Sequence, residues 1–244
     1  MVIRPIRKRC SAASPAPIRT SIIAWVVLIA LTLGSAVPGT SQPPDKPNTD
    51  DLIQAISDRD VARAKNILDS GIDLNRAGRY GVIPLNQAIV SRFPDLVTEM
   101  VNRGADVNLR PGFLSTPLAT AAEVCQKDMV VFLLEHGAKV DGRLTDADTP
   151  LIIASGNCSD GTVVQILLKA GADPNASDRV RVTPLLAAAH HGNIGAVEAL
   201  IAAGADLKAK NTDGQTALDI ARDHPFRTKA HDQIYAILLK ASRK

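Results

Sequence analysis

Residues 103–108 read RGADVN, and the chain spells nearly the same word four more times. The glycines of the five words are residues 71, 104, 137, 171 and 204, so they lie 33, 33, 34 and 33 residues apart. A spacing this constant is typical of a repeated structural unit. The other four words are SGIDLN (70–75), HGAKVD (136–141), AGADPN (170–175) and AGADLK (203–208).

A second short word occurs between each pair of glycines and keeps the same spacing. It reads IPL at 83–85, TPL at 116–118, 149–151 and 183–185, and TAL at 216–218. Its central residues are again 33, 33, 34 and 33 positions apart. Because two independent words agree, we interpret the period as a repeated unit and not as chance.

The residue types in these two words predict the structure of one repeated unit. Threonine is a good helix N-cap, and proline suits the first helical turn, where its missing N–H costs nothing. One apolar helix is expected over 117–125 and a second over 128–136. Gly137 can adopt the left-handed conformation that ends a helix, and the Asp and Asn letters suit the turn that follows.

Such a helix pair cannot bury its apolar face alone, so copies must stack into an array. The pattern resembles the ankyrin repeat from residue 50 to the C-terminus. The resemblance implies an all-α ankyrin-repeat solenoid of stacked helix-turn-helix units with protruding β-turn loops. We expect an N-terminal cap at 50–77, repeats at 78–110, 111–143, 144–177 and 178–210, and a C-terminal cap at 211–244.

The chain departs from the family pattern in three ways. The histidine usual after TPL is replaced by Asn86, Ala119, Ile152, Leu186 and Asp219, so we expect lower stability than in consensus arrays. The third repeat has one extra residue, best placed in 158–162. The last repeat has Pro225 where a helix-ending glycine is usual.

The N-terminus has the order of an export signal. Basic residues precede an apolar stretch at 22–33, and the small residues Gly34, Ser35 and Ala36 follow it. The apolar stretch is short for a membrane span of ~20 residues. We predict a bacterial-type signal peptide over 1–36, a proline-rich linker over 37–49, and export to the periplasm or beyond. The alternative is an uncleaved inner-membrane anchor at 22–37, with the array facing the periplasm.

Charge excludes nucleic acid as a partner. Five of the 28 basic residues precede residue 37 and no acidic residue does, which leaves 23 basic against 25 acidic residues, or about −2. A nucleic-acid binder needs clustered basic side chains, and the body of the chain has no such cluster.

Cys125 and Cys158 occupy equivalent positions in adjacent repeats. An oxidising compartment favours a disulfide between them. Stacked helices lie ~8–10 Å apart, however, and a disulfide needs Cα atoms within ~4.4–6.8 Å. The extra residue after Cys158 could let that loop lean across. Two reduced, buried cysteines are the alternative.

No pattern of metal ligation or catalysis is present. His190 and His191 are adjacent, so on a helix they point about 100° apart and cannot chelate one ion well. Known nucleophile, zinc and phosphate-loop motifs are absent. We therefore predict a non-enzymatic protein without metal or cofactor; a hydrolase with an unrecognised site is the remaining enzymatic alternative.

The resemblance implies a binding surface on the loop tips and the exposed ends of the first helices. Tyr80, beside Arg79, is the preferred contact, while Phe113 could instead fold back onto neighbouring loops. Large exposed aromatics are favoured interface anchors. The expected contact residues are Arg79, Tyr80, Val82, Ser91, Phe113, Ser115, Glu123, Asp146, Asp148, Asn157, Arg179, Val180, His190 and His191.

The function predicted from these features is non-catalytic binding of a protein outside the cytoplasm. The partner is an unidentified protein, and the chain is expected to be monomeric. An alternative is an envelope accessory protein that stabilises or protects a particular enzyme in stress defence. Both interpretations use the same surface and differ only in the partner.

Overall fold

A computed structural model describes residues 46–110, 115–142 and 148–243. The predicted signal peptide and most of the linker lie outside these residues. Residues 46–244 form one compact unit. Its helices are α2 (Thr49–Ser57), α3 (Val61–Asp69), α4 (Pro84–Val90), α5 (Pro94–Asn102), α6 (Pro117–Glu123), α7 (Lys127–Glu135), α8 (Pro150–Asn157), α9 (Thr162–Lys169), α10 (Pro184–His191), α11 (Ile194–Ala202), α12 (Ala217–Asp223) and α13 (Lys229–Ala241).

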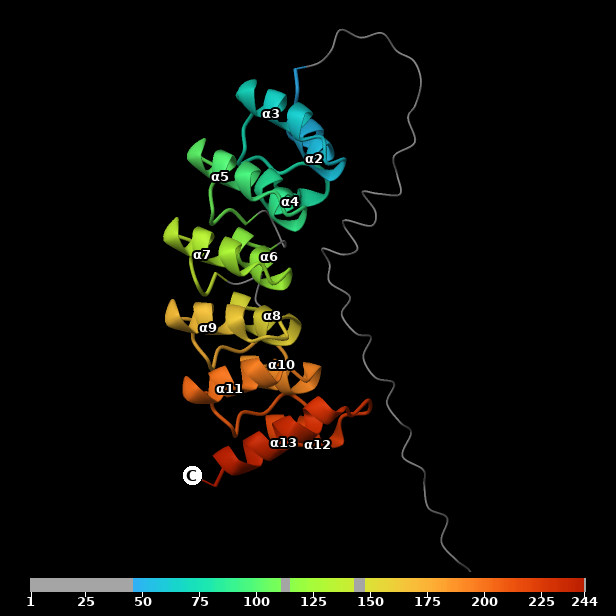
Figure 1. The fold of residues 1–244 in the computed structure, drawn as a ribbon, viewed down its shortest axis with the longest axis vertical. Helices are drawn as coiled ribbons and strands as arrows, with labels where there is room; N and C mark the ends of the chain where they lie inside the picture. The colour runs from blue at the N-terminus through green and yellow to red at the C-terminus, as the bar shows by residue number, and fades with distance from the viewer. Residues whose placement is uncertain (1–45, 111–114, 143–147, 244) are drawn as a thin grey trace, which may run out of the picture. The chain divides into compact units, whose positions relative to one another are not determined.

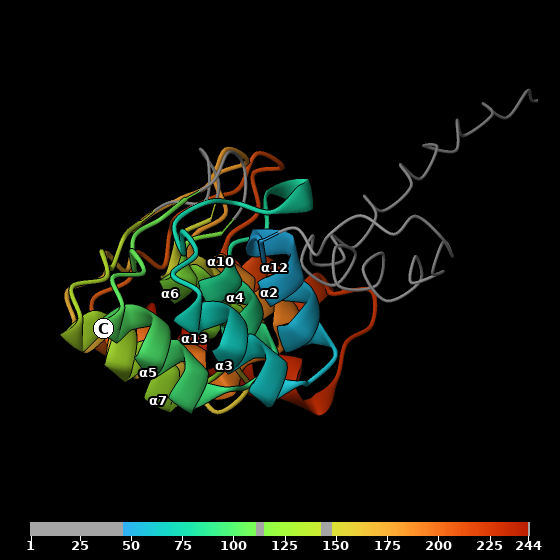
Figure 2. The same cartoon turned by 90° about the horizontal axis from the view of Figure 1, so that it is seen from above.

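The helices form antiparallel pairs that stack one on the next within this unit (Figure 1). The first helix of each pair contacts the first helix of the next pair, in the order α2, α4, α6, α8, α10 and α12. The second helices α7, α9, α11 and α13 likewise contact one another in that order. Viewed along the stack, the connecting loops lie on one side, and the second helices α3, α5 and α7 lie on the other (Figure 2). The described residues contain helices and no strands, so the predicted all-α stack is confirmed.

The repeated TPL word begins each first helix as its chemistry predicts. The Oγ atoms of Thr116, Thr149 and Thr183 accept hydrogen bonds from the N–H three residues later, at 3.2, 3.2 and 3.4 Å. Each following proline stands in the first turn. The leucine of the word is buried in the first four copies and half-buried in the last, so the same three residues start a helix and contribute to the core.

The glycine word ends each second helix and also joins one repeat to the next. Gly137 has a φ of 84°, in the left-handed region that ends helices. Asn108, the last letter of RGADVN, donates from Nδ2 to the Gly137 carbonyl at 2.9 Å, and its Oδ1 accepts from the Lys139 N–H at 2.8 Å. Asn75 makes the same two bonds to Gly104 and Asp106, at 3.1 and 2.7 Å. The word is therefore a helix stop and an inter-repeat bridge.

Replacing Asn108 with alanine removes both bonds to the next turn. Because an exposed hydrogen bond contributes about 0.5–1.5 kcal/mol, we expect a loss of about 1–2 kcal/mol in the free energy of unfolding, measured by urea denaturation. Asn102→Ala, at the exposed end of α5, is the control and should change little. Equal effects of the two substitutions would show that the bridge does not stabilise the array.

Cys125 and Cys158 are joined in a disulfide with Cα atoms 5.5 Å apart. The distance of ~8–10 Å between stacked helices does not limit this pair, because neither cysteine lies within a packed helix. Cys125 follows the end of α6 with a φ of 55°, and Cys158 is the C-cap of α8. The loop between α8 and α9, residues 158–161, is also one residue longer than the 124–126 loop between α6 and α7. The bridge joins the second and third repeats.

Reducing the disulfide should lower the free energy of unfolding by about 2–4 kcal/mol, because the bond closes a loop of 33 residues in the unfolded chain. Urea denaturation with and without a thiol reductant measures the difference. In a Cys125→Ala/Cys158→Ala variant, reductant should have no further effect. A native chain indifferent to reductant would contradict the bridge as a stabilising element.

The departures from the family pattern have different local consequences. Asn86 partly replaces the missing histidine, because its Nδ2 donates across to the Ser115 carbonyl at 2.7 Å. Asp219 instead forms a capping box with Thr216 at the start of α12. Pro225 follows the end of α12 and opens a longer connection to α13. No described helix is long and apolar enough to span a membrane.

Candidate partner-binding surface

The first loop tip presents Tyr80 to solvent on a fixed backbone. Tyr80 is 67% exposed and has a φ of 61° within the single turn Arg79–Gly81. The Arg79 N–H donates to Oδ1 of Asp50 at 2.6 Å, and the Arg79 Nε lies 3.4 Å from Oδ2 of the same carboxylate. Asp50 belongs to α2, so the N-terminal helix pair positions this tip.

The fourth loop tip presents Val180 in a similar way. The Oδ1 of Asp178 accepts from the N–H groups of Val180 and Val182 at 2.9 and 2.6 Å, which folds the loop around one carboxylate. Val180 is 46% exposed, and its carbonyl accepts from the Thr212 N–H of the next tip at 3.2 Å. Phe113 and Asp146, at the second and third tips, lie outside the described residues.

The other predicted loop residues are not equally accessible. Arg179 is exposed, and Asp148 is half-buried. Val82 is half-buried, while Ser115 is buried. The side chain of Ser115 therefore takes no part in the exposed surface. Its backbone carbonyl accepts the hydrogen bond from Asn86.

The predicted residues at the first-helix ends form a partly exposed row. Ser91 and Glu123 are half-buried, and Asn157 is exposed. The Nδ2 of Asn157 donates to the Glu123 carbonyl at 3.4 Å, which links two neighbouring helix ends. This row continues to the exposed His190 and His191 at the end of α10.

At that end of the row, four histidines lie together. The ring centroids are 4.9 Å apart for His190 and His191, 5.0 Å for His190 and His224, and 4.2 Å for His224 and His231. The sequence did not predict this cluster, because His224 and His231 lie outside the periodic part of the chain. Among the described residues, no group of three or more His, Cys, Asp or Glu side chains is placed to hold a metal ion.

The environment of the cluster favours neutral imidazoles. Although His190 remains exposed to solvent in part, desolvation of its ring lowers its pKa, and the neighbouring histidines lower it further. Burial is likewise the main cause that lowers the pKa of His191, followed by His224 and His231. The pKa of His224 is lowered by burial and then by His231. The neutral imidazole is therefore favoured at these three positions.

Phe226 is a further surface residue that sequence reasoning missed. It is 78% exposed, follows Pro225, and its ring centroid is 6.4 Å from that of His224. The Phe226 N–H donates to Nδ1 of His224 at 3.2 Å. A phenylalanine directly after a proline that interrupts the repeat was the available sequence signal.

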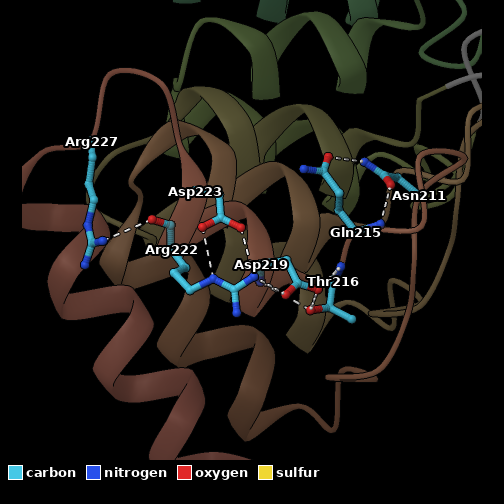
Figure 3. Close-up of polar contacts among 7 residues, drawn as sticks. All are labelled: Asn211, Gln215, Thr216, Asp219, Arg222, Asp223 and Arg227. Carbon is cyan, nitrogen blue, oxygen red and sulfur yellow. Dashed lines mark hydrogen bonds and ion pairs between the residues drawn. The ribbon is translucent and has the colours of Figure 1, made fainter. Parts of the chain in front are cut away.

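An arginine network holds the loop that carries Phe226 (Figure 3). Arg222 forms ion pairs with Asp219 at 3.0 Å and Asp223 at 2.8 Å. Arg227 donates from Nη1 to the Arg222 carbonyl at 3.0 Å and from Nε to Asp232 at 2.6 Å. These contacts tie α12, the loop and the start of α13 together, so Phe226 projects from an organised segment.

Comparison with known proteins identifies the repeats. A family model described as ankyrin repeats (3 copies) matches residues 110–178. A second model, described as ankyrin repeats (many copies), matches residues 167–221. The comparison with curated proteins gave no match. The matched residues run from the second repeat into the C-terminal helix pair.

Proposed function

Because this chain is an ankyrin-repeat protein, we propose that it binds a protein partner through the loop tips and first-helix ends. Ankyrin repeats generally mediate interactions between proteins. The proposed role is non-catalytic, and the binding unit is a monomer. The partner is recognised by side chains that the repeat pattern leaves free, since the periodic residues fill the core.

The observation that carries this proposal is the exposure of Tyr80 at a fixed tip. A tyrosine of which two thirds is exposed gains much apolar contact area on binding and has few rotamers to lose. Val180, on a loop tip three repeats further along, offers a second apolar contact. The connecting loops lie together on one side of the stack (Figure 2). An elongated partner surface could engage both tips together.

We propose that binding takes place outside the cytoplasm. The basic, apolar and small-residue order of residues 4–36 supports export. A disulfide between Cys125 and Cys158 supports an oxidising compartment, because cytosolic thiols are kept reduced. The periplasm is the proposed site, either after cleavage of the signal or with the signal retained as an anchor.

Affinity capture from an envelope extract of the source organism tests the proposal. Residues 46–244, which contain the whole described core, serve as bait beside a Tyr80→Ala/Val180→Ala variant. The control is Val61→Ala/Val131→Ala, which removes similarly exposed apolar side chains from second helices on the opposite side. Loss of anchor contacts of about 2 kcal/mol should weaken binding roughly 30-fold in the tip variant only.

A protein retained by the native chain and the control, and lost by the tip variant, would support the proposal and name the partner. Equal retention by all three baits would remove these tips from the interface. Loss from the control alone would move the interface to the second helices. Turnover by the purified unit in a broad hydrolase screen would contradict the non-catalytic role.

A further inference from the structure

His231 joins α13 to α10 through one ring nitrogen and caps the start of its own helix through the other. It is 4% exposed. Its Nε2 lies 3.1 Å from the His190 carbonyl, and its Nδ1 lies 3.2 Å from the Thr228 backbone nitrogen and 2.8 Å from the Thr228 hydroxyl. A carbonyl only accepts and a backbone N–H only donates, so these partners fit a neutral ring with hydrogen on Nε2 alone.

The same inter-repeat bond recurs at earlier joints with donors that do not titrate. The Nε2 of Gln126 donates to the Ile89 carbonyl at 2.6 Å. The Nδ2 of Asn193 donates to the Ser155 carbonyl at 2.7 Å. In each case a residue at or near the start of a second helix donates a hydrogen bond to a carbonyl near the end of the first helix of the preceding repeat. At the last joint this donor is the imidazole of His231, which lies against the His224 ring.

The surroundings of His231 offer little to stabilise added positive charge. The ring stacks on His224 with an interplanar angle of 18°, and His224 in turn lies against His190. Of the elements packed here, α10 contributes His190 and His191, and α8 places uncharged Gly156 against His191. The helix α11, which also contacts α13, carries one charged residue, the exposed Glu198.

The charged groups of α12, the loop and α13 are engaged with one another. Arg222 pairs with Asp219 and Asp223, and Arg227 pairs with Asp232. Lys229 at the start of α13 adds a further positive charge. Within the described residues, no carboxylate forms an ion pair with any of the four rings.

The direction of the pH effect follows from the lowered pKa values. Burial and mutual repulsion lower the pKa of His190, His191 and His224 in the folded chain. The unfolded chain, with histidine pKa values near ~6.5, therefore binds more protons in acid. Stability from this cluster is fully present above that value and is lost as the pH falls below it.

We propose that His190, His191, His224 and His231 form an acid-sensitive latch that holds α13 on α10. With neutral rings, the C-terminal helix pair is docked. When His190, His191 and His224 take up protons, their imidazolium groups repel one another around the bond from His231 to the His190 carbonyl, and α13 loosens. The surface around Phe226 and His190 then changes shape. The latch does not depend on the proposed function; only its effect on partner affinity does.

Hydrogen exchange of residues 46–244 at pH 7.5 and 5.0 tests the latch, with rates converted to protection factors at each pH. We expect amide protection in α13 to fall about tenfold or more in acid. Protection in α5 should be retained, because the first repeat contains no histidine. Equal protection of α13 at both pH values would overturn the proposal.

A His224→Gln/His231→Gln variant provides the matched control. Glutamine at position 231 can keep the capping box with Thr228 and cannot take up a proton in this range. The acid loss should largely disappear; a loss equal to that of the native chain would refute the latch. If this variant is unfolded at pH 7.5, the single variant His224→Gln replaces it in the test. The loss of α13 protection in acid must then be smaller in that variant than in the native chain. No partner is present, so this result is independent of the binding experiment.

Discussion

Burial of each helix pair against the next is the interaction on which the rest of this structure depends. A pair of helices of seven to nine residues cannot bury its apolar face alone, so the leucines of the TPL words and of the second helices are covered only in the stack. Hydrogen bonds then fix how one pair sits on another. Asn75 and Asn108 bridge the turns, and Gln126, Asn193 and His231 bridge the helix ends.

This construction separates framework from recognition. Residues that recur with the repeat cap helices, end them, fill the core or bridge neighbouring repeats. Tyr80, Val180 and Phe226 lie at positions where the repeat does not require a particular residue. They are among the most exposed large apolar side chains described. A rigid stack that presents non-periodic side chains suits recognition, because binding then costs little ordering.

The sequence predicted the fold well because the residues that cap each helix, fill the core and end each helix meet local requirements that recur in every repeat. It left the disulfide open because the Cα separation depends on two loop conformations, including a positive φ at Cys125, that no period dictates. It missed the histidine cluster because His224 and His231 belong to the irregular C-terminal pair. Ser115 was expected on the surface, but its loop buries it. Exposure of a side chain at a tip depends on local loop geometry, and only the structure shows this for Tyr80.

Mapping the contact surface of the captured partner tests the central claim most directly. Amide chemical shifts of residues 46–244 would be recorded with and without that protein. We predict that the largest changes fall on residues 78–82 and 178–182 and along the first-helix ends to His191, with the exposed faces of α5, α7 and α11 unaffected. Changes concentrated on those second helices would contradict the claim that the loop tips and first-helix ends are the binding surface.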